Sequence, residues 1–255
     1  MLLTAAEGAF AGLATLLVDL KVQLLLRPLL RFAEPESWHA VDTALDGMAE
    51  YAALAITSPR GAAALGGRMA LRRAHGVASG AAWRLPSHVA IWTSGAATSS
   101  ALGEVAAEPR WPADGAVRTS GAGLALADAM LAADVRGPVL YACGDRRRDE
   151  LPTRLRDAGI VVHEVVCYRT VLASLDEAAA AAALADLLVV ASPSVARLLA
   201  DVATMRRPLL IAVGPTTAAA AAAAGWTAAA IADAPTPLAV ARAVRTLLPS
   251  SPTSP

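Results

Sequence analysis

The sequence is poor in cysteine, histidine and aromatic residues, and neither sign of charge is in excess. Its 2 cysteines are too few for a disulfide framework, and with 4 scattered histidines they form no metal-binding motif. The 22 basic and 22 acidic residues give a formal net charge of +0, so bulk electrostatics points to neither nucleic acid nor an anionic membrane as a partner. Any anionic ligand must therefore be bound by local groups.

A membrane-spanning segment and a secretory signal are not expected either. The uncharged stretch at residues 208–232 is broken by glycine, proline and threonine, and it consists largely of alanine, which contributes little to membrane insertion. The first 22 residues lack a basic start and carry acidic residues within the apolar pattern, unlike a signal peptide. We expect a cytoplasmic protein.

The middle of the chain contains a complete β-α-β unit. An apolar run of strand length at residues 139–143 is broken by Gly144, which tolerates positive φ. Asp149 is expected to cap the following helix and Gly159 to end it, and a second strand follows from residue 160. Cys143 and Cys167 fall inside the two strands, so both thiols are interpreted as core residues.

The rest of the chain continues this alternation of strands and helices, with a loop predicted over residues 75–82. Its 255 residues suit two α/β domains of about 120 residues each. Such an alternation predicts doubly wound parallel sheets, whose ligands bind at the carboxyl ends of the strands. Further strands or extended pieces are predicted at residues 2–4, 22–26, 29–33, 54–57, 89–93, 187–191, 209–213 and 228–231.

Hydroxyl-bearing turns recur where the predicted strands end, as a weak internal repeat. Ser58 and Ser192 each precede a proline that opens an alanine-rich helix, and Thr98 and Thr217 follow glycine-containing turns. Free backbone N–H groups and hydroxyls at a helix start suit a carboxylate or phosphate. The alternative is that these residues only cap their helices.

Two further features are open to a functional and a structural interpretation. Residues 146–148 are three arginines after the Gly144 turn, which either reach an anionic ligand or form a solvated charged turn. Tyr168 ends the second strand of the β-α-β unit, where its phenol either donates a proton into a cleft or packs in the core.

Several ordered segments resemble the uroporphyrinogen-III synthase family. VLYACGDRRRDELPTRLRDAGIVVHEVVCYRT is similar to the family signature, and ASPSVARLLADV, AVGPTTAAAAAAAGW and ADAPTPLAVARAV follow in family order and spacing. In the first half, ITSPRGAAAL resembles the family's Ser-Pro-Arg turn. The resemblance covers nearly the whole chain.

The resemblance implies an α/β fold of two similar doubly wound parallel-sheet domains joined by a two-stranded ladder, with the first domain discontinuous. Domain 1 would comprise residues 1–28 and 171–248, and domain 2 residues 34–166. Residues 29–33 and 167–170 would be the interdomain strands, and 249–255 a disordered tail.

The implied activity is the conversion of the linear tetrapyrrole hydroxymethylbilane to uroporphyrinogen III. Water is lost, the last pyrrole ring is inverted through a spiro intermediate, and the ring closes, with no metal or organic cofactor. The family also implies a monomer and a transient contact with the preceding deaminase, which makes the substrate.

The resemblance assigns Tyr168 as the catalytic hydrogen-bond donor or acid that assists departure of the hydroxyl group. The implied substrate-binding residues are Thr57, Ser58, Arg60, Thr98, Cys143, Gly144, Ser192, Ser194, Thr216 and Thr217. One departure from the family pattern is Ala5, where an arginine usually follows the first strand. Two alternatives remain. One is a noncatalytic synthase-like module that binds tetrapyrroles or has a regulatory role, and the other is a carboxylate-binding protein unrelated to tetrapyrroles.

Overall fold

The computed structural model describes residues 1–6, 8–79, 83–103, 110, 121–202 and 207–248, and these divide between two compact units. Unit 1 is formed by Met1–Arg31 with Val171–Pro255, and unit 2 by Phe32–Thr170. Each unit contains one five-stranded sheet. The fold is therefore α/β with two sheets, while the domain limits inferred from the resemblance stay a prediction. The predicted tail at 249–255 and the end of the predicted loop at 80–82 lie outside the described residues.

The sheet of unit 2 has the strand order β3-β7-β6-β4-β5, and the pairs β7-β6, β6-β4 and β4-β5 are parallel. Both β3 and β7 continue past the boundary between the units. The elements are β3 (Leu30–Ala33), α2 (His39–Asp46), a 3-10 turn (Met48–Glu50), β4 (Ala53–Ile56), α3 (Pro59–Ser79), β5 (Ala90–Thr93), α4 (Ala96–Leu102), α6 (Ala122–Ala132), β6 (Val139–Gly144), α7 (Glu150–Asp157) and β7 (Val162–Leu172).

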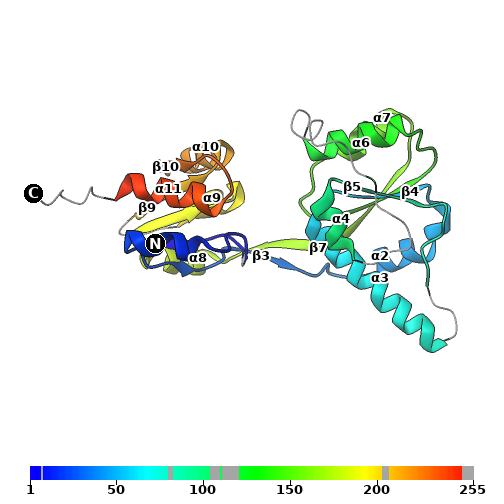
Figure 1. Ribbon diagram of the computed structural model, residues 1–255, viewed down its shortest axis with the longest axis horizontal. Helices are drawn as coiled ribbons and strands as arrows, with labels where there is room; N and C mark the ends of the chain where they lie inside the picture. Colours follow the sequence, from blue (N-terminus) through cyan, green and yellow to red (C-terminus); the bar gives the residue numbers. More distant parts are fainter. Residues whose placement is uncertain (7, 80–82, 104–109, 111–120, 203–206, 249–255) are drawn as a thin grey trace, which may run out of the picture. The chain divides into compact units, whose positions relative to one another are not determined.

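Alternate residues of these strands face two separate cores, as expected for a sheet covered on both sides. Leu54, Ile56 and Leu140 belong to the core that includes residues of α2 and α3, whereas Ala55 and Tyr141 belong to the core that includes residues of α6 and α7. Figure 1 shows α6 and α7 on one side of the sheet and α2 and α3 on the other. The doubly wound arrangement is confirmed.

Unit 1 repeats this plan with the strand order β10-β9-β8-β1-β2, and all of its pairs are parallel. Among the described residues, no helix in either unit is long and apolar enough to cross a membrane. The elements are β1 (Leu2–Leu3), α1 (Leu13–Leu17), a 3-10 turn (Val18–Leu20), β2 (Leu25–Leu26), α8 (Leu175–Ala183), β8 (Leu187–Val190), α9 (Pro193–Leu198), a 3-10 turn (Leu199–Asp201), β9 (Leu209–Val213), α10 (Pro215–Ala223), β10 (Ala228–Ala232) and α11 (Pro237–Leu247).

Two local predictions were wrong. The loop predicted from residue 75 is helical as far as Ser79, because residues 71–79 contain no proline and include leucine, arginine and alanine, which favour the continuation of α3. Asp149 lies at the N-cap position of α7 but makes no capping hydrogen bond, since its carboxylate instead accepts from Arg147 at 2.8 Å. The predicted stop at Gly159 is confirmed, with φ of +79°.

Candidate functional site

The predicted site residues of unit 2 gather at one edge of its sheet. Because β4, β5, β6 and β7 run parallel, the ends of β4, β5 and β6 lie along the same edge. Thr57 and Ser58 directly follow β4, Gly144 ends β6, and Tyr168 pairs with Gly144 across the β6-β7 ladder. Residues far apart in sequence thus meet where a ligand of such a sheet is expected.

Tyr168 lies against the backbone of Gly144. The register of β6 and β7 shifts there, so that Cys143 faces Val166 and Gly144 faces Tyr168. A Cβ atom on Gly144 would lie 2.5 Å from Cζ of the phenol ring, closer than any side chain tolerates. Any larger residue here would force the ring of Tyr168 to move, so the close approach of the ring accounts for a glycine at the end of a buried strand.

The hydroxyl of Tyr168 lies beside the start of α3. It is 3.3 Å from Oγ of Ser58, and that oxygen accepts a hydrogen bond from the backbone N–H of Gly61 at 3.0 Å. Ser58 therefore caps α3, as the structural alternative predicted, and also contacts the candidate catalytic group. The positive end of the α3 dipole favours negative charge near this pair of hydroxyls.

Asp145 holds the backbone of β7 through two hydrogen bonds, one at Tyr168 and one at Thr170. Its N–H donates to the carbonyl of Tyr168 at 3.1 Å, and its carboxylate accepts from the N–H of Thr170 at 2.8 Å. These two bonds hold the irregular register in which the phenol lies over Gly144. Sequence reasoning missed Asp145, because nothing in its local pattern indicates a partner on another strand.

The other hydroxyls of this edge are joined to one another. Oγ1 of Thr57 is 2.8 Å from the hydroxyl of Tyr141, and Oγ of Ser94 donates to the Thr57 carbonyl at 3.0 Å. Ser94 is also 2.9 Å from Oγ1 of Thr98, which is only 2% exposed. Thr98 thus holds a neighbouring turn in place, whereas Thr57 and Ser58 are half-buried at the edge.

Cys143 is a core residue and carries no thiolate chemistry at this edge. Its Sγ lies 3.5 Å from the carbonyl of Val165, and burial raises the pKa of the thiol to about 12. Burial likewise raises the pKa of Cys167 to about 12. The interpretation of both cysteines as buried is confirmed, and only the backbone of Cys143 can face a ligand.

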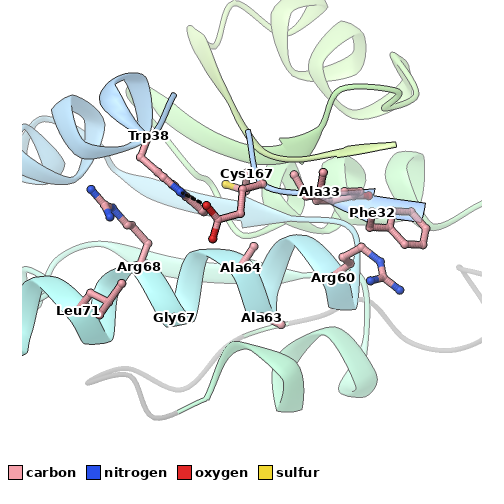
Figure 2. Close-up of a pocket in the computed structure, with 12 residues that line it drawn as sticks. Phe32, Ala33, Trp38, Arg60, Ala63, Ala64, Gly67, Arg68, Leu71 and Cys167 are labelled. Atoms are coloured by element: carbon pink, nitrogen blue, oxygen red, sulfur yellow. Dashed lines mark hydrogen bonds between the residues drawn. The ribbon is translucent and has the colours of Figure 1, made fainter. Parts of the chain in front are cut away.

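A pocket of about 670 Å³ opens beside Tyr168, between α3 on one side and β3 and the start of α2 on the other (Figure 2). Phe32 contacts Tyr168 edge to face, with 5.8 Å between the ring centroids. The guanidinium of Arg60 lies 3.5 Å from the centroid of the Phe32 ring and makes no ion pair among the described residues. Arg60 thus keeps its positive charge available near the phenol.

Of the three arginines at 146–148, Arg147 is held by acidic residues. It forms ion pairs with Glu164 of β7 and with Asp149. Burial by itself would raise the pKa of the Glu164 carboxyl, but the hydrogen bonds from Arg147 and Arg156 outweigh it and leave that pKa lowered. For Arg147, this arrangement agrees with the interpretation that the arginines form a charged turn and do not reach a ligand.

In unit 1 the predicted residues again lie where neighbouring strands end. Ser192 follows β8 and caps α9, with its Oγ accepting from the N–H of Ser194 at 3.2 Å. Thr216 and Thr217 open α10 after Gly214, whose φ is +82°; Thr216 is exposed, whereas Thr217 is 3% exposed. Since β8 and β9 are paired and parallel, both helix starts lie at one sheet edge.

These features define a class: an α/β protein whose parallel sheets present hydroxyls, backbone N–H groups and a tyrosine at their carboxyl edges, as suits an anionic ligand. A family model described as uroporphyrinogen-III synthase HemD matches residues 11–241. The chain therefore belongs to the uroporphyrinogen-III synthase family, which acts in porphyrin and heme biosynthesis.

Solved structures show the same fold. A mutant uroporphyrinogen III synthase from the extreme thermophile Thermus thermophilus is 18% identical, with a TM-score of 0.60, and the match covers 96% of this chain and 98% of that chain. A uroporphyrinogen-III synthetase from Helicobacter pylori is 16% identical, with a TM-score of 0.59 and coverage of 97% and 98%. No curated protein sequence matches the chain.

Proposed function

We propose that this protein is an active uroporphyrinogen-III synthase, a carbon–oxygen lyase that closes hydroxymethylbilane to uroporphyrinogen III with inversion of the last pyrrole ring and loss of water. Family membership supports the reaction class. The observation that carries the proposal is the phenol of Tyr168, which lies over Gly144 with its hydroxyl 3.3 Å from Oγ of Ser58 at the carboxyl edge of the sheet.

The role proposed for Tyr168 is that of an acid or hydrogen-bond donor in the first step. The carbon–oxygen bond of the hydroxymethyl group breaks, a proton from the phenol helps the oxygen to leave as water, and an azafulvene remains. The substituted α-carbon of the last ring then attacks the azafulvene carbon and forms the spiro intermediate. The bond from that ring to its original methylene bridge breaks, which leaves a second azafulvene, and the free α-carbon of the same ring attacks it to close the macrocycle. That carbon loses its proton, which replaces the one taken from the phenol, so the sequence needs no oxidant or reductant.

Selectivity would come from how the reactive intermediate is held. The azafulvene can also close the ring without inversion. The protein must therefore hold the substrate in the geometry that leads to inversion. In unit 2, Ser58 and the start of α3 supply polar groups for substrate carboxylates, and Arg60 supplies a cation. In unit 1, Ser192, Ser194, Thr216 and Thr217 at the helix starts are proposed to bind carboxylates in the same way.

The proposal is tested by a coupled assay on the whole chain. Hydroxymethylbilane is generated in the reaction mixture, the purified protein is added, and the products are oxidised and separated into type I and type III uroporphyrin. A dominant type III product is expected, because spontaneous closure gives type I. Only type I from folded protein would contradict the proposal and favour the noncatalytic tetrapyrrole-binding module, with Ala5, 8% exposed in place of an arginine, as the first residue to examine.

A further inference from the structure

The pocket beside Tyr168 follows one face of α3 and continues well beyond the residues assigned to the reaction. We call it the α3 groove. It lies entirely in unit 2, and its α3 side is formed by residues spaced three and four apart, which share one helix face. These residues are Arg60, Ala63, Ala64, Gly67, Arg68 and Leu71.

The floor of the α3 groove is made of small side chains, which keep the space open. Ala63, Ala64 and Gly67 lie between the two arginines in Figure 2. A Cβ atom added to Gly67 would meet nothing within 4 Å. The volume of about 670 Å³ falls within the range of about 300–1,000 Å³ that is typical of small-molecule sites.

The walls and charges of the α3 groove favour a particular ligand chemistry. Phe32 and Trp38 provide aromatic surfaces opposite the small floor residues. Arg60, without an ion pair among the described residues, lies at the end next to Tyr168, whereas Arg68 is engaged by both carboxylate oxygens of Asp42. A flat ring that carries a carboxylate arm therefore finds an apolar surface and one available guanidinium.

Glu34 adds a hydrogen-bond acceptor to this groove. Its Oε2 lies 3.4 Å from Nε1 of Trp38, and its carboxylate has no ion pair with an arginine or lysine among the residues whose placement is described. An acidic group here disfavours a ligand that presents only anionic groups. It suits a ring N–H, which can donate to the carboxylate while the ligand's own carboxylate reaches Arg60.

We propose that the α3 groove binds a pyrrole ring of the substrate that does not react, with the carboxylate arm of that ring at Arg60 and its N–H directed to Glu34. This inference rests on the proposed function and extends it, because pyrroles with acetate and propionate arms combine the required features: a flat ring, an N–H donor and carboxylates. Since the groove reaches Tyr168, a ring bound there would hold its neighbour near the phenol.

The test is to fill the groove without disturbing α3. Gly67→Leu and Ala63→Leu place a large side chain in the open space, and both replacements suit a helix. Ala70→Leu is the matched control, because Ala70 is exposed on the same helix and does not line the groove. We expect the two filling variants to raise KM for hydroxymethylbilane about tenfold with a smaller change in kcat, as for lost ground-state binding, while Ala70→Leu stays within about twofold.

The outcomes separate this inference from the proposed function. If the wild type gives type III product and both filling variants have the same KM as Ala70→Leu, the proposal that the α3 groove binds a pyrrole ring is contradicted, while the synthase activity is supported. Wild-type protein that gives only type I would overturn both. A urea unfolding midpoint no lower than that of the wild type shows that the filling variants are folded. If Gly67→Leu is not folded, the test rests on Ala63→Leu.

Discussion

Tyr168 is the residue proposed to act in the chemical step, and the chain offers a matched control for it. Tyr168→Phe keeps the ring over Gly144 and removes only the hydroxyl near Ser58. We expect the rate of type III formation to fall by about 100-fold, as is typical for loss of a general acid, with spontaneous type I product taking its place. Tyr51→Phe removes a hydroxyl that is 3.0 Å from Nδ1 of His163, near the start of β4, and should stay within about threefold of the wild type. Equal rates for both variants would remove Tyr168 from the mechanism.

Gly144 is predicted to be intolerant of even one added methyl group. Gly144→Ala places Cβ 2.5 Å from Cζ of Tyr168, so the ring must move, and we expect a loss of about 1–3 kcal/mol in the free energy of unfolding. Urea unfolding measures this loss. If the ring is the cause, Gly144→Ala should cost much less in a Tyr168→Ala background, and an unchanged cost in that double-mutant cycle would point to another contact.

At the scale of elements, the β6-α7 turn holds β7 through Asp145. Asp145→Ala removes the acceptor for the N–H of Thr170, and the freed strand should misplace the phenol. We expect kcat to fall by about 10- to 100-fold with little change in KM, because small displacements of a catalytic group are costly. Asp145→Asn keeps an amide oxygen as the acceptor and should recover most of the activity. If the asparagine variant is as impaired as the alanine variant, the negative charge matters and not the hydrogen bond.

The ion pairs between α2 and α3 should make the free energy of unfolding depend on pH in the acidic range. Hydrogen bonds from Arg68 are the main reason that the pKa of Asp42 is lowered in the folded protein. A carboxyl with a lowered pKa stabilises the fold above its unfolded pKa of about 3.9, and this contribution is lost as the pH falls through the folded value. We therefore expect Asp42→Asn to reduce the fall in unfolding free energy between about pH 5 and pH 2, measured by urea unfolding at each pH. Asp46→Asn, which removes a more exposed carboxylate from the same helix, is the control.

For the whole molecule, strands and their polar ends could be predicted from sequence because they depend on local signals. Apolar runs that end in glycine, serine or threonine located the carboxyl edges, and the positions of Gly144 and Tyr168 follow from the β-α-β pattern and the family resemblance. The end of α3 could not be predicted, because a single glycine such as Gly76 is compatible with a loop or with a continuing helix, and here the helix continues to Ser79. Asp145 was missed because its partner, Thr170, lies on β7, far along the chain from the turn that holds Asp145. The α3 groove needed the structure, because small residues show open space only once their neighbours are placed.

The discontinuous make-up of unit 1 sets an order of events during synthesis. β1 and β2 emerge first, but β1 lies between β2 and β8, so half of its hydrogen-bonding neighbours are translated only after the whole of unit 2. The sheet of unit 2 is complete once β7 has left the ribosome. A fragment spanning residues 30–172 should therefore unfold cooperatively in urea, whereas residues 1–31 alone should give no helical or sheet signal in circular dichroism. During translation, β1 therefore lacks one of its two neighbouring strands until β8 has been synthesised.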